Sequence, residues 1–547
     1  MSMIASLYGS MVFNDDKMKK RLPADVYKRY HQCLKEGSKH SSADANVIAN
    51  EMKDWAVEMG ATHYTHWFQP MTGITAEKHD SFIEPEGDSV IMKLSGKELI
   101  KGEADASSFP NGGLRSTFEA RGYTAWDMSS YAFIKDGTLC IPTVFLSYGG
   151  ESLDKKTPLL KSEELIEKQA KRLLHLLGKE VSSVITTVGA EQEYFLIDKK
   201  MYHKRKDLVY TGRTLFGNRP PKTQELDDHY FGVIKPRVLA FMKELNEECW
   251  KLGIPAKTQH NEVAPCQHEL APIFTLTNRA CDQNQIIMEL MKKVADRHDL
   301  VCLLHEKPFN GINGSGKHNN WSMSADGENL LSPSGRDEQF LLFLCAVIQA
   351  VDEYPALLRV AAASAGNDHR LGGHEAPPAV LSIFIGNDLE ERIRDFIYQR
   401  GTTASGRSSL NVDVHSLPKF AQDTSDRNRT SPFAFTGNKF EFRMLGSSQS
   451  IACSNINLNT AVADVMCRFA DRLEKCSGDL HDEIREVIRE SYEDHHRIIF
   501  NGDGYADEWI KEAEKRGLLN LPTTADTLPH YLDPKNIALF ERNKIFT

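Results

Sequence analysis

Val188-Gly-Ala-Glu191-Gln-Glu193-Tyr-Phe-Leu-Ile-Asp198 combines β-forming residues with two carboxylates two positions apart. On a strand, residues at i and i+2 point to the same face. Two anions that project together into a half-buried region repel each other, and one stays protonated unless a cation is present. We therefore predict a strand with a cation-binding face. The alternative is an edge strand whose acids are solvated.

A second acidic pair, Glu262 and Glu269, flanks Pro265 in the segment Gln259–Glu269. Proline should bend or interrupt a strand at this point. Hard divalent cations such as Mg²⁺ prefer oxygen ligands and keep waters and substrate phosphates in their shells. Two acidic pairs therefore favour a divalent metal site more strongly than either pair does alone.

The glycine-rich segment Asn310–Ser322 nearly matches a phosphate-binding loop. The serine or threonine that should follow Lys317 is replaced by His318, which disfavours such a loop. Glycines would instead allow the backbone to approach a ligand closely, and His318 offers an imidazole to a metal. A plain surface loop is the alternative.

Two later segments add cations to the candidate site. Asp368–Pro378 is a flexible stretch with Arg370 and Glu375, and Lys439-Phe-Glu441-Phe-Arg443 places its charged residues on one face of a strand. A solvated amphipathic strand is the alternative for the second segment. A surplus of both carboxylates and cations is typical of phosphoryl transfer, which depends on positioning and charge neutralisation. It disfavours a metal-dependent hydrolase.

Bulk composition excludes several classes of protein. The chain has 547 residues, 41% of them hydrophobic, and a formal net charge of -10. This charge, without a sustained basic run, gives no footprint for nucleic acid. The amino terminus lacks the pattern of a secretory signal, and the longest apolar stretch, Phe340–Val351, is shorter than the roughly 20 residues that span a bilayer. Ten scattered cysteines suit a reducing compartment. We expect a cytoplasmic protein with a buried helix at 340–351.

The chain contains no internal repeat or long linker, so its organisation follows from changes of pattern. We expect an amino-terminal helical extension at 1–60, a small, mostly β domain at 61–155, and a catalytic domain at 156–547 that ends in a helical segment. Within it, Ser162 is the candidate cap of a first helix, and Gly178 lies beyond the end of that helix. Further helices are expected at 231–252 and 278–298.

Five segments of the chain, taken in order, resemble the signatures of glutamine synthetases. They are GAEQEYFLID, HNEVAPCQHE, NGSGKHNNWS, RLGGHEAP and NKFEFR. Three amino-terminal segments narrow the resemblance to type III: FNDDKMKKRLP, FQPMTGITAEKHDSF and SSFPNGGLRSTFEARGYTAWD. The resemblance covers essentially the whole chain. The resemblance implies an α+β fold. In this fold a β-grasp-like amino-terminal domain precedes a catalytic domain whose curved antiparallel sheet is flanked by helices.

The resemblance also implies two metal sites in a funnel between subunits. The implied ligands are Glu193, Glu262 and Glu269 for the first ion, and Glu191, His318 and Glu441 for the second, which faces the ATP phosphates. The implied ion is Mg²⁺ or Mn²⁺.

Substrate and nucleotide contacts are implied in the same way. The implied glutamate pocket consists of Asn313, Gly314, Arg370 and Arg443, and the implied nucleotide-binding residues are Asn320, Ser322, Arg429 and Lys439. Glu375 would lie on a flap that closes over the site and would help to deprotonate bound ammonium. Glu375, Arg370 and Arg443 are thus the expected catalytic residues.

The implied reaction is ATP-dependent ligation of ammonia to the side-chain carboxylate of L-glutamate through a γ-glutamyl phosphate, which gives L-glutamine, ADP and phosphate. The implied partners are L-glutamate, ammonium and ATP as co-substrate, with no nucleic acid and no membrane. The implied assembly is a homo-oligomer of rings, a dodecamer, with active sites shared between subunits. The alternatives are a ligase of the same fold that uses another amine, and a non-catalytic structural relative.

Three features depart from the wider family. Ala434 stands where other types have an arginine that contacts ATP phosphates, so phosphate neutralisation must be shared differently. The run that supplies an ammonium-site aspartate elsewhere is missing, and Asp80 is only a candidate for that role. Chains of type III usually continue beyond the position of Thr547, so we expect a carboxy-terminal helical portion to be absent or untranslated here.

Overall fold

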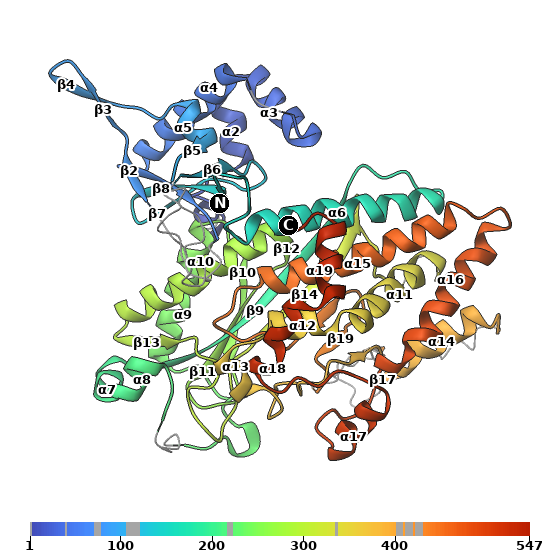
Figure 1. Ribbon diagram of the computed structural model, residues 1–547. Helices are drawn as coiled ribbons and strands as arrows, with labels where there is room; N and C mark the ends of the chain where they lie inside the picture. Colours follow the sequence, from blue (N-terminus) through green and yellow to red (C-terminus); the bar gives the residue numbers. More distant parts are fainter. Residues whose placement is uncertain are drawn as a thin grey trace.

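The computed structural model describes residues 3–38, 41–69, 78–104, 121–215, 222–333, 337–400, 409–410, 420–421 and 430–546. Its fold is α+β, with a small sheet near the amino terminus and a larger curved sheet in the main body (Figure 1). Long helices, among them α6 (Lys156–Leu176), α11 (Asp337–Glu353) and α15 (Ala452–Leu473), pack beside the larger sheet (Figure 1). The predicted fold class is confirmed.

The described amino-terminal part combines five helices with a six-stranded sheet whose order is β2-β1-β8-β6-β5, with β7 paired to β8. Strands β1 and β8 run parallel, and the other pairs are antiparallel. Helices α2 and α4 begin after residues that cap them, because the side chains of Asn14 and Ser41 accept hydrogen bonds from N–H groups of the first turn. The hairpin β3–β4 projects away from this sheet (Figure 1). The elements are α1 (Met3–Leu7), α2 (Asp15–Arg21), α3 (Ala24–Glu36), α4 (Ser42–Glu58), β1 (His63–Trp67), β2 (His79–Ser81), β3 (Ile83–Glu86), β4 (Ser89–Met92), α5 (Gly96–Ile100), β5 (Lys101–Gly102), β6 (Gly122–Trp126), β7 (Phe133–Lys135) and β8 (Thr138–Ser147).

The main body is built on a ten-stranded sheet of order β10-β11-β9-β14-β20-β19-β16, with β12 and β13 paired to β9 and β15 paired to β14. Apart from the parallel pair β16–β19, these strands are antiparallel. Its strands are β9 (Val184–Asp198), β10 (Ala256–Asn261), β11 (Gln267–Pro272), β12 (Thr275–Leu276), β13 (Leu300–Leu303), β14 (Lys317–Ala325), β15 (Glu328–Asn329), β16 (Ile383–Phe384), β19 (Phe433–Phe435) and β20 (Phe440–Phe442). A separate pair joins β17 (Ser409–Leu410) to β18 (Phe420–Ala421).

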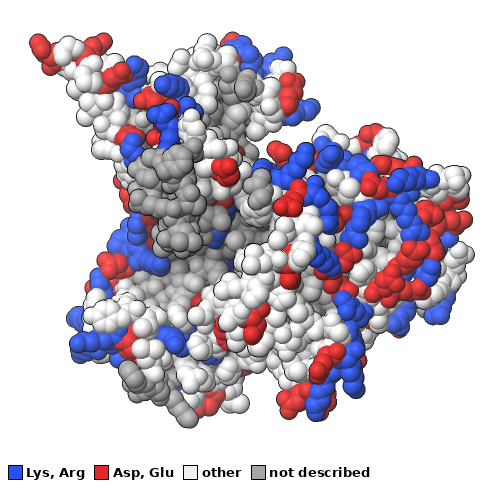
Figure 2. All heavy atoms as spheres, viewed as in Figure 1, with Lys and Arg blue, Asp and Glu red and all other residues white. Residues whose placement is uncertain are grey.

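The remaining helices complete the body and the carboxy-terminal segment. They are α7 (Lys199–Lys204), α8 (Lys206–Thr211), η2 (Glu225–Asp227), α9 (Pro236–Lys251), α10 (Thr277–Arg297), α12 (Pro355–Ala361), α13 (Ala365–Arg370), α14 (Asn387–Ile397), α16 (Leu480–His495), η3 (His496–Ile498), α17 (Asp507–Lys515), α18 (Thr524–Thr527), η4 (Leu528–Leu532) and α19 (Pro534–Arg542). Side chains of both signs intermingle over the carboxy-terminal helices on the face drawn in Figure 2.

Helix α11 carries the apolar stretch that we expected to be a buried helix, and this prediction is confirmed. Every residue from 339 to 352 is buried. Within the described ranges, no single helix is long and apolar enough to cross a membrane. Helices α11 and α12 pass that test only as a pair, and the pair is bent by 76°.

The expected start of α6 at Ser162 is wrong. The helix begins at Lys156, and the Ser162 hydroxyl lies buried within it, where it donates to the carbonyl of Leu159 at 2.7 Å. Pro158 lies in the first turn, where a missing N–H costs nothing. Tertiary packing also favours the longer helix, because Lys156 and Leu159 are fully buried.

Candidate active site

Strand register brings the predicted metal ligands onto one face of the large sheet. On β9, Glu191 lies opposite His318 of β14, and Glu193 lies opposite Glu269 of β11. Glu441 of β20 lies opposite Asn320, two residues beyond His318 on β14. Since β9 pairs with neighbours on both sides, the edge-strand alternative for its two acids is wrong.

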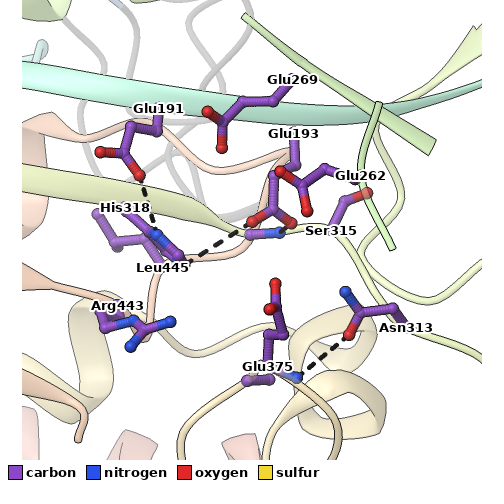
Figure 3. A network of polar contacts seen from close by, with 12 residues as sticks. Glu191, Glu193, Glu262, Glu269, Asn313, Ser315, His318, Glu375, Arg443 and Leu445 are labelled. Carbon is purple, nitrogen blue, oxygen red and sulfur yellow. Dashed lines mark hydrogen bonds and ion pairs between the residues drawn. The ribbon is translucent and has the colours of Figure 1, made fainter. Parts of the chain in front are cut away.

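A cavity of about 320 Å³ opens onto this face. Figure 3 shows the carboxylates of the large sheet on one side of it, with Glu375 pointing toward them from the opposite side. Among the described residues, its wall comes only from positions 191 to 443, and Glu441 lies just behind it against His318. The lining residues are Glu191, Glu193, Asp227, Tyr230, Phe231, His260, Glu262, Val263, Glu269, His318, Glu375 and Arg443.

His318 lies between two carboxylates. Its Nδ1 is 3.0 Å from Glu191 Oε2 and 3.0 Å from Glu441 Oε1. Burial opposes protonation of the imidazole, but these carboxylates outweigh burial and raise the pKa of His318 to about 10. Its Nε2 is buried without a hydrogen-bond acceptor among the described residues, and Glu193 Oε1 lies 3.7 Å away. An oxygen-rich set with one imidazole fits a divalent cation that would replace the proton.

A second cluster joins Glu262 and Glu269 to His260. The Nε2 atom of His260 is 3.0 Å from Glu269 Oε1, and its Nδ1 is 3.5 Å from Glu262 Oε1. The hydrogen bond to Glu269 raises the pKa of His260 to about 9. Burial, then the charges of Glu193 and Glu269, raise the pKa of Glu262 to about 10. Glu262 is therefore neutral near pH 7 unless a cation joins it, which is the fit that a metal site requires.

His260 was missed as a site residue in the sequence. The sequence contains a signal for His260, because it lies two positions before Glu262, which directly follows β10. Glu191 and Glu193 on β9 have the same spacing. The structure brings His260, rather than Glu193, within bonding range of Glu269. One oxygen of Glu193 is already held, because Oε2 accepts from the N–H of Gly316 at 2.6 Å.

The glycine segment passes behind these ligands and is not a phosphate loop. The ammonium group of Lys317 is fully buried and donates to Asn284 Oδ1 at 2.9 Å, away from the cavity. A Cβ atom at Gly316 would overlap the guanidinium group of Arg370. Glycine at this position therefore allows the backbone to lie between Arg370 and Glu193.

The two arginines of the predicted glutamate pocket occupy different places. Arg443 lines the cavity, with its Nε 3.8 Å from Glu441 Oε1. Arg370 is buried behind the glycine segment, where its guanidinium donates to the carbonyls of Leu445 and Arg443, each at 3.2 Å. Arg370 does not line the described cavity, so in this arrangement it holds the loop.

The remaining pocket residues connect the flap to the glycine segment. The N–H of Glu375 donates to Asn313 Oδ1 at 3.3 Å, and the carboxylate of Glu375 points into the cavity (Figure 3). The carbonyl of Gly314 accepts from Gln267 Nε2 at 3.0 Å. Asn313 thus links the glycine segment to the flap segment around Glu375 by a direct hydrogen bond.

Two of the predicted nucleotide-binding residues, Asn320 and Ser322, lie on the same face of β14 as His318. Asn320 Nδ2 donates to Glu191 Oε1 at 2.9 Å, and Ser322 Oγ donates to the carbonyl of Asn438 at 2.8 Å. Lys439 adjoins that turn and is partly exposed. None of these three lines the described cavity, and Arg429 lies outside the described residues. Ala434 is buried directly opposite Glu441.

Comparison with known families covers both ends and the centre of the chain. The family described as "Glutamine synthetase type III N terminal" matches residues 4–162. "Glutamine synthetase, catalytic domain" matches residues 168–381, and "Glutamine synthetase C-terminal domain" matches residues 483–547.

Similar proteins agree with these matches. A glutamine synthetase of Bacteroides fragilis (strain YCH46) is 50% identical over 99% of this chain and 76% of its own length. The type-3 glutamine synthetase of Dictyostelium discoideum is 48% identical over 100% of this chain and 76% of its own length.

Two solved structures share the fold. The cryo-electron microscopy structure of Plasmodium falciparum glutamine synthetase has a TM-score of 0.56 at 13% identity, and the match covers 93% of this chain and 98% of that one. A GmaS/ADP complex has a TM-score of 0.55 at 14% identity, with 90% of this chain and 94% of that one covered.

The acidic cavity fits the activity of this family, which synthesises glutamine with ATP and uses divalent metals. The amino-terminal and catalytic family models match this chain in the expected order. Relatives that are about half identical to it match over essentially the full chain. The chain therefore belongs to the glutamine synthetase family, type III.

Proposed function

We propose that the cavity is the place where the γ-phosphoryl group of ATP passes to the side-chain carboxylate of L-glutamate, and where ammonia then displaces phosphate to give L-glutamine. The observation that carries this proposal is a surplus of buried carboxylates with too little positive charge. Burial and neighbouring acids raise the pKa of Glu262 to about 10. Such a site is suited to cations that are coordinated both by these carboxylates and by phosphate oxygens.

The ligand sets fit two hard cations, Mg²⁺ or Mn²⁺. Glu193, Glu262 and Glu269, which line the same cavity, would hold the first ion. Glu191, His318 and Glu441, whose ligand atoms lie within 4.8 Å of one another, would hold the second. Bound cations supply the positive charge that neutralises the transferring phosphoryl group. His260 lies beside the first set and provides part of that charge when protonated.

The other residues bind and orient the substrates. Arg443 projects into the cavity and balances the carboxylates of the bound substrates, while Asn313 and Gly314 present amide and backbone groups to glutamate. Arg370 supports that pocket from behind through its bonds to the carbonyls of the 443–445 segment.

Glu375 takes the proton from ammonium, since it is the carboxylate that faces the metal-ligand row across the cavity (Figure 3). Asn320, Ser322, Arg429 and Lys439 bind the nucleotide. Closure of the flap excludes water, which protects the acyl phosphate until ammonia attacks.

The active sites are shared between neighbouring subunits of a homo-oligomeric ring, in a dodecamer. Support comes from the cavity wall, to which no described residue before position 191 contributes. We retain the division into 1–60, 61–155 and 156–547, in which the second unit closes a neighbour's site.

A coupled assay tests the proposal. Purified protein is given ATP, glutamate and either ammonium, methylamine or a polyamine, with Mg²⁺ or Mn²⁺ titrated from zero, while phosphate and amide are measured together. We expect stoichiometric glutamine and phosphate with ammonium, and no turnover after chelation of the metal. Preferred amidation of another amine would reassign the acceptor, and turnover in the presence of chelator would refute the metal sites.

A further inference from the structure

The segment that carries Glu375 is held by three distant parts of the chain. The N–H of Glu375 donates to Asn313 Oδ1 at 3.3 Å. On the next residue back, His374 Nδ1 lies 3.1 Å from Gln224 Nε2. On the other side, the Tyr505 hydroxyl contacts the carbonyl oxygens of His374 and, at 3.0 Å, Ala376. Tyr505 therefore contacts the carbonyl of the residue on each side of Glu375.

Residues 499–526 of the carboxy-terminal segment also fix the chain before and after this flap. Before it, the N–H of Thr524 donates to Asp368 Oδ2 at 2.7 Å. After it, Val380 forms an antiparallel bridge with Asn520, and the N–H of Phe500 donates to the carbonyl of Ile383 at 2.8 Å. The same short stretch of chain thus contacts both ends of the flap and its centre.

Tyr505 is itself anchored on the carboxy-terminal segment. Its N–H donates to Asp503 Oδ1 at 2.9 Å, and the neighbouring Gly504 N–H donates to Thr430 Oγ1 at 2.7 Å. Phe500 and Trp509, which flank this turn in sequence, stack on each other with ring centroids 3.6 Å apart. A rigid base of this kind allows one hydroxyl to position a separate loop.

The flap needs such support because its backbone is unfavourable in isolation. His374 has φ of 57°, in the left-handed region that residues with a side chain seldom occupy. Such conformations persist where the surrounding structure holds them. Partial burial raises the pKa of Tyr505 to about 12, so the hydroxyl keeps its hydrogen and can donate to either carbonyl at physiological pH.

We infer that Tyr505 is a positioning residue for amide formation: its hydroxyl holds the backbone at His374 and Ala376 so that Glu375 stays directed into the cavity. The inference rests on the role proposed above for Glu375, on which Tyr505 acts. It gives the carboxy-terminal segment, more than 120 residues beyond the flap in sequence, a part in coupling ATP use to glutamine formation.

The test variant is Tyr505→Phe, which removes the hydroxyl and keeps the ring. Loss of one hydrogen bond should raise the open population of the flap about five-fold. We expect the phosphate released in excess of glutamine to rise by a similar factor at limiting ammonium, which raises the ratio of phosphate to glutamine, with the KM for ATP unchanged. Tyr531→Phe is the matched control, since Tyr531 belongs to the same carboxy-terminal segment and lies in η4; its ratio should match that of the unsubstituted protein.

Hydrogen exchange separates this inference from the proposed role of Glu375. The backbone amides at 371–376 should exchange about five-fold faster in Tyr505→Phe, while amides of β14 should not change. Unchanged exchange at 371–376 would overturn the inference, whatever Glu375 does. If Glu375→Ala releases phosphate without glutamine and Tyr505→Phe does not, the proposed function stands and the inference fails. If exchange accelerates but neither variant uncouples the products, the role of Glu375 fails, and with it the coupling by Tyr505.

Discussion

At the scale of single residues, Glu441 illustrates how closely the predicted ligands depend on each other. Its side chain is 1% exposed, and its carboxylate lies 3.0 Å from His318 and 3.8 Å from Arg443. In the proposed site, this carboxylate would serve the second ligand set while also lying near the charge of Arg443.

Replacing Glu441 with Ala should lower ATP-dependent phosphate transfer by more than about 100-fold, because it removes one ligand of the second cation set. Initial rates of phosphate and glutamine formation at saturating Mg²⁺ provide the measurement. Thermal melting checks that the fold survives, and Glu441→Gln keeps the shape without the charge. Turnover like that of the unsubstituted protein would remove Glu441 from the site.

Replacing Glu375 with Ala should impair amide formation more than acyl-phosphate formation, because the proposed role of this carboxylate follows phosphoryl transfer. Phosphate release without matching glutamine is the expected signature, measured over a range of ammonium concentrations. Equal loss of both products at every concentration would contradict the flap assignment.

Asp154 provides a test of pH dependence outside the site. It is fully buried and accepts hydrogen bonds from the N–H groups of Phe145 and Thr157, each at 3.1 Å. Burial raises its pKa from 3.8 to about 6, despite these bonds. The folded state therefore holds this proton more tightly than the unfolded state, so the contribution of Asp154 to stability is present below pH 4 and is lost as pH rises through 6.

Asn at position 154 does not titrate. The Tm of the unsubstituted protein minus the Tm of Asp154→Asn should therefore fall as pH rises from about 4 to about 6, and stay level above about 7. Differential scanning fluorimetry of both proteins in matched buffers measures the difference, in which the other titrating groups cancel. A difference that grows over this interval would show that Asp154 is charged in the folded state.

At the scale of secondary-structure elements, alternation along each strand sets which residues share a face, and pairing sets what those residues meet. For β20 the sequence left open a solvated amphipathic strand. That alternative is wrong, because Phe440, Glu441 and Phe442 are all buried. The phenylalanines pack in the main core and Glu441 meets His318 on the opposite face.

The junction between the small sheet and the body depends on a buried ion cluster at the start of α6. Lys156 is fully buried, with Nζ 2.8 Å from Asp127 Oδ2 of the amino-terminal part and 2.6 Å from Asp282 Oδ2 of α10. Burial opposes the charge on Lys156, but the two carboxylates outweigh burial and raise its pKa.

Lys156→Met should destabilise the folded protein by about 3–5 kcal/mol, because two buried carboxylates lose their counter-charge. The fall in Tm measures the effect, with Lys168→Met on the exposed face of the same helix as the control. The triple variant that also carries Asp127→Asn and Asp282→Asn should recover much of the loss. An unchanged Tm in Lys156→Met would mean that the cluster does not hold the junction.

At the scale of the whole molecule, the amino-terminal part and the body share apolar packing but not the described cavity. Val12, Trp67 and Phe133 join one core with Phe241 and Leu245 of α9. The cavity wall nonetheless begins at Glu191. The amino-terminal sheet is thus packed against its own body, and its described residues do not line that body's cavity.

Shared sites predict complementation between two inactive chains. A Glu193→Ala chain mixed with one disrupted in the amino-terminal domain should regenerate some intact composite sites, although neither works alone. Co-refolded oligomers are verified by mass, and their glutamine formation is compared with that of each parent. Verified mixed rings that stay as inactive as the parents would place each site within a single chain.

Local pattern in the sequence determined the elements and the chemical class of the site. The β-forming run around Glu191 and Glu193 predicted a strand, found at 184–198, and helical spacing predicted 278–298, found at 277–297. The cationic and acidic residues indicated phosphoryl transfer. These inferences succeed because alternation, helical periodicity and ligand type depend on neighbours along the chain.

Only the tertiary structure decided which of those residues meet. Strand register set Glu193 and His260 against Glu269. Packing of other segments placed Arg370 behind the glycine segment and brought Tyr505 to the flap. Such contacts join positions dozens to hundreds of residues apart, and they depend on burial and strand pairing across the whole fold, which no short stretch of sequence encodes.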